Sequence, residues 1–289
     1  MNLEIYLPVA LLALTNMLMA WRQPRMHPAW HARVLVVLTG ATALTLLAVL
    51  VFVIMIAAGT LKAADATVMG NVLIDHGQVP APVGGLAIAA LLVITAAIVH
   101  AIVRWRGELR KARALGTGVV ADERPFAVAV PGREGGVVLS KGLMTLLSRR
   151  ELEVVLRHEA AHLKHRHHLY LMAGTLATRI FPALVYPHRA LAYALERWAD
   201  EEAAKAIGDR VLVARTIARV ALAQPASTSS AYPALTGSHV TRRVEALLGQ
   251  TPPDNRFTGP ALLGGAWMAT GTAISPTLTH HATLLLLLL

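Results

Sequence analysis

Long apolar runs dominate the N-terminal third of the chain. Residues 34–58 and 84–103 contain no charged side chain, and residues 3–20 contain only Glu4. A helix of about 20 apolar residues crosses the hydrocarbon core of a bilayer, so each run predicts a transmembrane helix. A fourth is predicted over 259–280, where glycine and proline dilute the apolar pattern.

Basic side chains at the ends of these runs predict the orientation of the chain. Arg22, Arg25 and Arg33 follow the first run, and a basic cluster that starts at Arg104 follows the third. Positively charged loops stay on the cytoplasmic side of a membrane. We therefore expect the N-terminus outside the cell and the region after residue 104 inside it.

The expected fold is a mainly α-helical, multi-pass protein of the cell membrane. Residues 1–103 form a membrane domain with three transmembrane helices, residues 104–257 a cytoplasmic α+β domain, and residues 258–289 a C-terminal transmembrane helix. The apolar segment 169–185 is short for a crossing and contains Arg179. We expect it to form a helix that is buried in the cytoplasmic domain or lies at the membrane surface.

Two strands are expected near the start of the cytoplasmic domain. Residues 126–130 and 136–140 are mostly apolar and flank the turn sequence PGRE at 131–134, a pattern typical of a hairpin. An edge strand of such a hairpin can hold an extended peptide by backbone pairing. A hairpin that only covers the core is an equally good interpretation.

Composition agrees with a membrane setting. Hydrophobic residues make up 55% of the chain and charged residues only 15%, against about 25% charged in soluble domains; the mean hydropathy is +0.53. The absence of cysteine excludes disulfides, Cys-ligated zinc and thiol chemistry. The net charge of +10 arises largely at the ends of the apolar runs, which favours anionic lipid over nucleic acid as the partner.

A distinct polar pattern begins in the cytoplasmic domain with the sequence RHEAAH. Ser148 and Glu151 form a capping-box pattern, followed by apolar residues at helical spacing, so we expect one unbroken helix from 148 to 172. His158 and His162 are four residues apart, on one face of that helix, and can bind the same metal ion.

Glu159 lies beside this histidine pair. Its carboxylate can accept a proton from a metal-bound water, as in the HExxH motif of zinc peptidases. A catalytic zinc takes three protein ligands, and a nearby candidate for the third is His168, at the position of the third histidine in the metzincin pattern HExxHxxGxxH. That pattern requires glycine at position 165, where this chain has His165, a residue suited to a helix end.

A second helix offers the better third ligand. It is expected over 188–207 and ends at Gly208. Glu196 and Asp200 are four residues apart on it, so Glu196 can reach the metal while Asp200 accepts a hydrogen bond from a ligand histidine. The neighbouring residues are small enough for a close approach of the two helices: Ala199, Ala203 and Ala204. The alternative is a solvated charged face, which the presence of HEAAH disfavours.

HEAAH followed by ERWAD resembles the gluzincin arrangement of integral membrane metallopeptidases, HExxH and then ExxxD. The chain is most similar to the BlaR/MecR-type family, membrane zinc proteases of antibiotic-response signalling, and next to the HtpX/Ste-type family. The likeness is strongest over 122–210, with a weaker match in SHVTRRVEALL at 238–248.

The resemblance implies one zinc ion per chain in a gluzincin-like peptidase domain that lies between the third and fourth transmembrane helices. It assigns the ligands to His158, His162 and Glu196, the catalytic base to Glu159, and the outer carboxylate to Asp200. A second donor to the oxyanion is usual in such sites. Four residues are candidates for it, none preferred: Tyr186, His188, Tyr193 and Arg197.

Three functions are open at this point. The first is an endopeptidase that hydrolyses peptide bonds of a cytoplasmic or membrane protein. Its expected role is regulatory signalling, by cleavage of a BlaI-type transcriptional repressor. The second is an HtpX-like protease for membrane protein quality control. The third is a catalytically inactive membrane scaffold or sensor with structural zinc, which is disfavoured because a structural site closes all four coordination positions. The expected partners are a protein or peptide substrate and the lipid bilayer, with no direct binding of nucleic acid, and a homodimer is compatible with the sequence.

Overall fold

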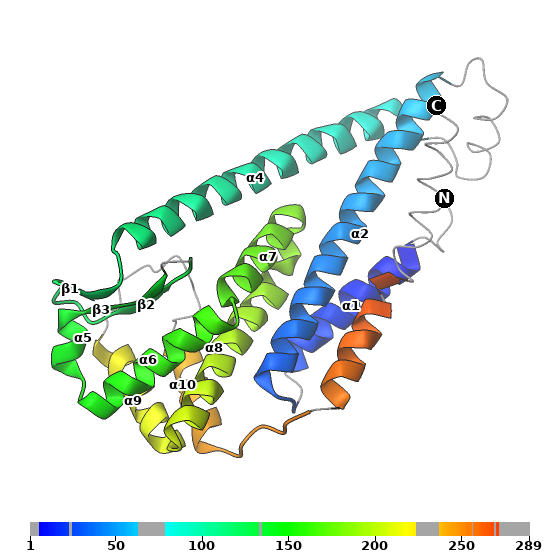
Figure 1. Cartoon of the computed structure of the whole chain (residues 1–289). Coiled ribbons are helices and arrows are strands. Elements are labelled where there is room, and N and C mark those ends of the chain that lie inside the picture. Colours follow the sequence, from blue (N-terminus) through cyan, green and yellow to red (C-terminus); the bar gives the residue numbers. More distant parts are fainter. Residues whose placement is uncertain are drawn as a thin grey trace.

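In the residues that a computed structural model of the chain describes, three helices precede the compact part of the molecule (Figure 1). The structure describes residues 6–271 except for 23–24, 63–78, 133–134, 224–236, 256 and 269. The three helices are α1 (Tyr6–Arg22), α2 (Pro28–Lys62) and α4 (Ala81–Ala114).

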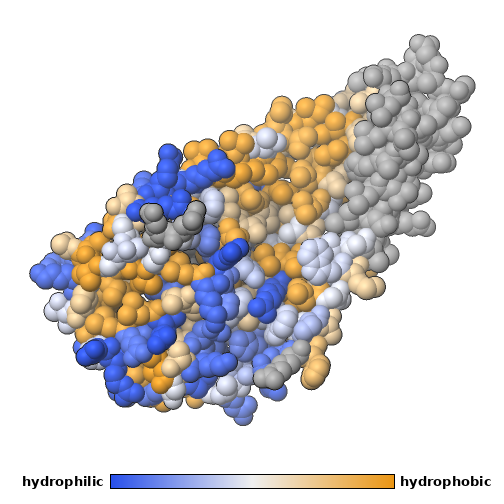
Figure 2. All heavy atoms as spheres, in the orientation of Figure 1, coloured by the Kyte–Doolittle hydropathy of each residue, from blue (hydrophilic) through white to orange (hydrophobic). Residues whose placement is uncertain are grey.

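Two of these helices are long and apolar enough to cross a membrane, over Pro28–Ala58 in α2 and over Ala81–Ala114 in α4. Hydrophobic surface extends along the long helices, whereas many hydrophilic residues lie over the compact end (Figure 2). The described part of α1 has 17 residues. The predicted fourth crossing is helical over 258–271, apart from residue 269, and its remainder lies outside the described residues. Four crossings and their orientation therefore stay predictions.

A small sheet follows α4. Its strands are β1 (Gly118–Val120), β2 (Ala127–Val130) and β3 (Gly136–Ser140), in the order β1-β3-β2. β2 and β3 pair antiparallel, with Ala127 opposite Leu139, which confirms the predicted hairpin. β1 was not predicted; it pairs parallel with β3.

Six helices and a short 3-10 turn build the rest of the compact part, as far as the structure describes it and before the helical residues at 258–271. They are α5 (Lys141–Leu146), α6 (Arg149–Lys164), α7 (His167–Ile180), η2 (Pro182–Leu184), α8 (Val185–Ile207), α9 (Arg210–Ala223) and α10 (Gly237–Leu248).

The unbroken helix expected from 148 to 172 is wrong. Helix α6 ends at Lys164, and Arg166 adopts a left-handed conformation with φ of 53° before α7 begins. A non-glycine residue in this conformation costs about 1–2 kcal/mol. The turn places the side chain of His167 in the interior, where it contacts Trp198, and this burial offsets the local cost.

The boundaries of the next helix also differ from the expectation. Helix α7 ends at Ile180, before Pro182, and α8 begins at Val185, three residues earlier than the expected 188. Pro187 is compatible with this start because the first turn of a helix needs no backbone N–H donor. The predicted end is confirmed: Gly208 is the C-cap, with φ of 75°.

Helix α8 is the central element of the compact part (Figure 1). One face packs against the first turns of α2, in a core formed by Ala29, Ala32, Leu35, Ala190, Leu191, Ala194, Leu195 and Trp198. Elsewhere α8 packs against α6, where Val154 meets Ala203 and Ala204. Helix α8 therefore lies between α2, which is apolar and long enough to cross a membrane, and the polar helix α6.

Candidate metal centre

Helix α6 positions two histidines one turn apart. Its start is fixed by the predicted capping box: the backbone N–H of Ser148 donates to Glu151 Oε2 at 2.8 Å, and Ser148 Oγ accepts from the backbone N–H of Glu151. His158 and His162 then lie on one face of the helix, with their Nε2 atoms 3.1 Å apart. The two ring nitrogens are oriented toward one point.

Glu196 of α8 brings a carboxylate to that point. Its Oε2 lies 3.5 Å from Nε2 of His158, and its Oε1 lies 3.6 Å from Nε2 of His162. The approach depends on small residues, because Ala199 and Ala203 of α8 are completely buried. The structure thus brings together the three side chains that the sequence singled out.

The donor set fits a zinc ion. Zinc binds imidazole nitrogen at about 2.0–2.1 Å and carboxylate oxygen at about 2.0–2.2 Å in tetrahedral geometry, which places two ligand atoms about 3.3 Å apart. The two Nε2 atoms are 3.1 Å apart, and each lies 3.5–3.6 Å from one oxygen of Glu196, Oε2 for His158 and Oε1 for His162. Two imidazoles and one carboxylate at such spacing form a three-ligand site of the catalytic type.

The Nδ1 atom of each histidine, on the other side of the ring from Nε2, also has a close neighbour. Nδ1 of His158 lies 3.1 Å from Oδ1 of Asp200, the arrangement predicted for the outer carboxylate. Nδ1 of His162 lies 3.0 Å from Nδ1 of His167, which is completely buried. Such contacts fix the ring orientation of ligand histidines. The sequence analysis did not single out His167, because its contact with His162 follows from the turn at Arg166.

Arg243 of α10 completes the site and was not predicted. It donates to both oxygens of Asp200, from Nε at 2.8 Å and from Nη2 at 2.7 Å, and its Nη1 lies 2.9 Å from Oε2 of Glu196. The arginine is only 4% exposed. It lies four residues before the buried Leu247 on an amphipathic helix, and this inward position was the available signal.

The charges of the site perturb one another. Burial opposes ionisation of Asp200, but Arg243 and His158 outweigh it and lower the pKa of Asp200 to about 2. In the same way Arg243 and the two histidines hold the pKa of Glu196 well below its ordinary value. Burial lowers the pKa of His162. For His158 burial acts in the same direction, but Asp200 and Glu196 raise its pKa to about 10. Both carboxylates are therefore held ionised, next to the histidine nitrogens.

Glu159 lies half-buried next to this cluster. Its carboxylate makes no hydrogen bond or ion pair with any residue that the structure describes, and its negative charge opposes the lowering of the pKa of His162. A carboxylate that is near a metal ligand and otherwise uncommitted is suited to proton transfer.

The alternative ligands lie elsewhere. His168 is not part of the three-residue cluster; the charged groups that act on it are Arg166 and Arg113. His165 is the C-cap of α6 and lies 3.5 Å from Glu202, in line with the helix-end role expected for it.

None of the four candidates for the second oxyanion donor belongs to the cluster of His158, His162 and Glu196. Arg197 donates to Glu201 at 2.8 Å, and the hydroxyl of Tyr193 donates to the backbone carbonyl of Arg242 at 3.4 Å. His188 packs against Gly174, and Tyr186 is exposed.

Comparison with known proteins supports a peptidase interpretation of this centre. Residues 110–234 match the model of a family described as peptidase family M48. A stretch of 70 residues is 39% identical to a protein named "Protease HtpX homolog" from Thermodesulfovibrio yellowstonii, and this match covers 24% of each chain. The chain thus spans about a quarter of the length of that curated relative. No solved structure matches. The family match includes α6 and α8 but ends before α10, which carries Arg243.

Proposed function

We propose that the protein is a membrane-bound, zinc-dependent endopeptidase, because residues 110–234 match the model of peptidase family M48. The family match and the HtpX homolog support the predicted class, a membrane metallopeptidase, and the homolog agrees with the HtpX/Ste-type likeness. The observation that carries the proposal is the convergence of His158, His162 and Glu196 from two helices, with Glu159 uncommitted beside them.

His158, His162 and Glu196 would hold the zinc ion. When bound, zinc would polarise the scissile carbonyl and the attacking water as a Lewis acid. Glu159 then accepts a proton from the attacking water and passes it to the leaving amine. Glu159 is free for this role, since it forms no ion pair with any residue that the structure describes.

The surrounding residues keep the ligands in place through the reaction. Asp200 orients His158, His167 orients His162, and Arg243 ties Asp200 to Glu196. Because Asp200 and Arg243 are buried, these contacts are shielded from water and salt. The site is then preorganised, so little rearrangement opposes catalysis.

The position of strand β2 is compatible with a peptide substrate. It lies at an edge of the described sheet and contacts α6. An extended peptide can add to such an edge by backbone hydrogen bonds, which select weakly among side chains. This loose selection suits an enzyme that cleaves more than one sequence.

Two biological roles follow from the two family resemblances. An HtpX-like role in membrane protein quality control is supported by the named relative. Cleavage of a BlaI-type repressor in regulatory signalling rests on the sequence motifs alone. A metal site without catalysis, in a scaffold or sensor, would give Glu159 no chemical task.

The test is a pair of substitutions on α6. We expect Glu159→Gln to lower cleavage of a membrane-protein substrate by about 10²–10⁴-fold, while zinc content stays at one ion per chain. Glu153→Gln is the matched control, because Glu153 lies on the same helix and, among the described residues, forms an ion pair only with the exposed Arg157. Undiminished cleavage by a zinc-loaded Glu159→Gln protein would contradict the proposal and favour the scaffold.

A further inference from the structure

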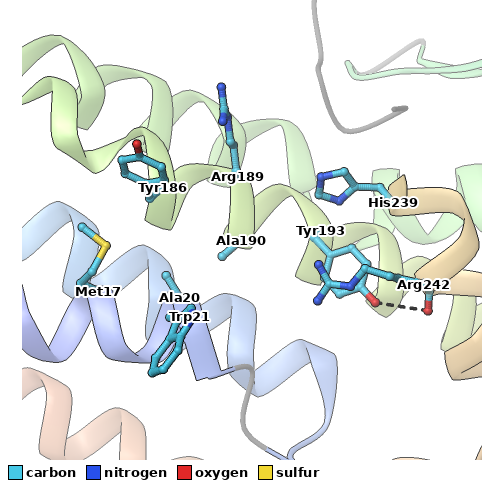
Figure 3. A pocket seen from close by; sticks show the side chains of 9 residues that line it. All are labelled: Met17, Ala20, Trp21, Tyr186, Arg189, Ala190, Tyr193, His239 and Arg242. Carbon is cyan, nitrogen blue, oxygen red and sulfur yellow. Dashed lines mark hydrogen bonds between the residues drawn. The ribbon is translucent and has the colours of Figure 1, made fainter. Parts of the chain in front are cut away.

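A cavity lies away from the metal ligands, between α1, α8 and α10. Its volume is about 410 Å³, within the range of small-molecule sites. Figure 3 shows α1 contributing one wall and α8 another, with α10 closing one end. The lining residues are Met17, Ala20, Trp21, Tyr186, Arg189, Ala190, Tyr193, His239 and Arg242.

The polar residues of the cavity are basic or aromatic. None of the described residues that line it carries a carboxylate. Arg189 of α8 and Arg242 of α10 are exposed, and neither forms an ion pair with any residue that the structure describes. Arg242 lies over the ring of Tyr193, 4.7 Å from its centroid. The cavity therefore has uncompensated positive charge, unlike the interior, where Arg243 is paired with acids.

His239 adds an unused hydrogen-bonding atom. Its Nδ1 is buried and has no hydrogen-bond partner in the described part of the chain. Burial, followed by the charges of Arg242 and Arg189, lowers the pKa of His239. Both arginines therefore lie close to the imidazole of His239, which lines the same cavity.

The opposite wall is apolar and continues along α1. Leu11, Leu14 and Leu18 are exposed on this helix, and Trp21 is 76% exposed near its end, beside Arg22. Tyr186, on the α8 side, is 60% exposed. Tryptophan and tyrosine concentrate at the level of lipid headgroups, so this arrangement places the basic end of the cavity at headgroup depth.

We propose that this cavity, the basic pocket, binds the phosphate headgroup of an anionic phospholipid. Arg189 and Arg242 neutralise the phosphate, His239 hydrogen-bonds to it, and an acyl chain runs along Met17 and the exposed leucines of α1. Basic pockets beside membrane helices bind anionic headgroups in this way. Free phosphate carries at least as much negative charge but has no apolar part to contact α1.

The experiment uses the full-length protein in a neutral detergent. Binding is measured calorimetrically with dihexanoyl phosphatidylglycerol, dihexanoyl phosphatidylcholine and inorganic phosphate. We expect the phosphatidylglycerol to bind at least tenfold more tightly than either of the others. Equal binding of inorganic phosphate would overturn the assignment to lipid, and equal binding of the phosphatidylcholine would overturn the role of the arginines.

Matched double variants locate the site. Arg189→Gln with Arg242→Gln should weaken phosphatidylglycerol binding about 30-fold, since each basic side chain near an anionic surface contributes about fivefold. Arg149→Gln with Arg215→Gln removes the same charge from exposed arginines of α6 and α9, outside the pocket, and should change binding less than twofold. Equal losses in the two double variants would contradict the proposal.

A third variant separates the lipid from a peptide. Trp21→Ala, which removes no charge, should weaken phosphatidylglycerol binding and leave cleavage of a soluble peptide unchanged. If an acidic peptide instead competes with the lipid, and the pocket variants raise KM for that peptide without lipid present, the basic pocket is a substrate subsite and the lipid proposal is wrong.

Discussion

Removal of Arg243 should strongly destabilise the metal-free protein. The guanidinium donates two hydrogen bonds to Asp200 and pairs with Glu196, in surroundings that leave Arg243 4% exposed and Asp200 completely buried. Arg243→Met keeps much of the side-chain volume but removes the guanidinium from the buried Asp200 and the partly buried Glu196.

Breaking a buried ion pair by removing one partner costs about 3–5 kcal/mol. For a chain of this size each kcal/mol corresponds to about 2–4 °C in the midpoint of thermal unfolding. We therefore expect a decrease of about 6–20 °C for metal-free Arg243→Met. Zinc should reduce this loss, because the ion neutralises Glu196. Arg243→Lys should be intermediate, since lysine keeps the charge but cannot donate to both oxygens of Asp200.

The assay is thermal unfolding in detergent, with and without zinc. Arg215→Met is the control for a change of charge, because Arg215 is exposed on α9, and it should alter stability by less than about 0.5 kcal/mol. A second substitution, Asp200→Asn, should recover part of the stability of Arg243→Met, because it removes one unpaired carboxylate. Strictly additive effects of the two substitutions would refute a coupled pair.

Three further predictions concern the ligands, the helix cap and the core. Glu196→Ala should abolish binding of one zinc equivalent, whereas His168→Ala should retain it; metal analysis showing the reverse would move the third ligand to His168. Glu151→Gln should destabilise the protein by about 1 kcal/mol at pH 7, because hydrogen bonds to a charged carboxylate are stronger than those to a neutral amide. Hydrogen bonds from Ser148, with Arg219, lower the pKa of Glu151, so this stabilisation exists above the ordinary value near 4.5. The difference from wild type should disappear as the pH falls below it in denaturation series. Leu191→Ala should cost about 2–5 kcal/mol in chemical unfolding, because Leu191 is completely buried between α2 and α8; a neutral effect would argue against that packing.

Local signals explain what could be predicted from the sequence. The capping box at Ser148, the four-residue spacing of His158 and His162, and Gly208 at the end of α8 act within one or two helical turns. Such features need no knowledge of distant segments. The same holds for the β2–β3 hairpin, whose turn is short.

Features that depend on tertiary packing were missed. The break at Arg166 is unfavourable locally and is stabilised by burial of His167 against α8. Strand β1 has only three residues and pairs with a strand that follows later in the chain. Arg242 and Arg243 are adjacent and alike in sequence, yet one faces solvent and the other binds Asp200. Only the position of α10 distinguishes them.

The packing of α8 on α2 has a practical consequence for biochemistry. Residues 104–257, released as a free fragment, would expose Leu191, Leu195 and Trp198 to water, since their covering side chains belong to α2. Because Glu196 lies on the same helix, a loss of packing on that face would also disturb the alignment of Glu196 with the two histidines. Extraction conditions that pull the N-terminal helices away from the rest should therefore inactivate the protein, even where every ligand side chain is still present.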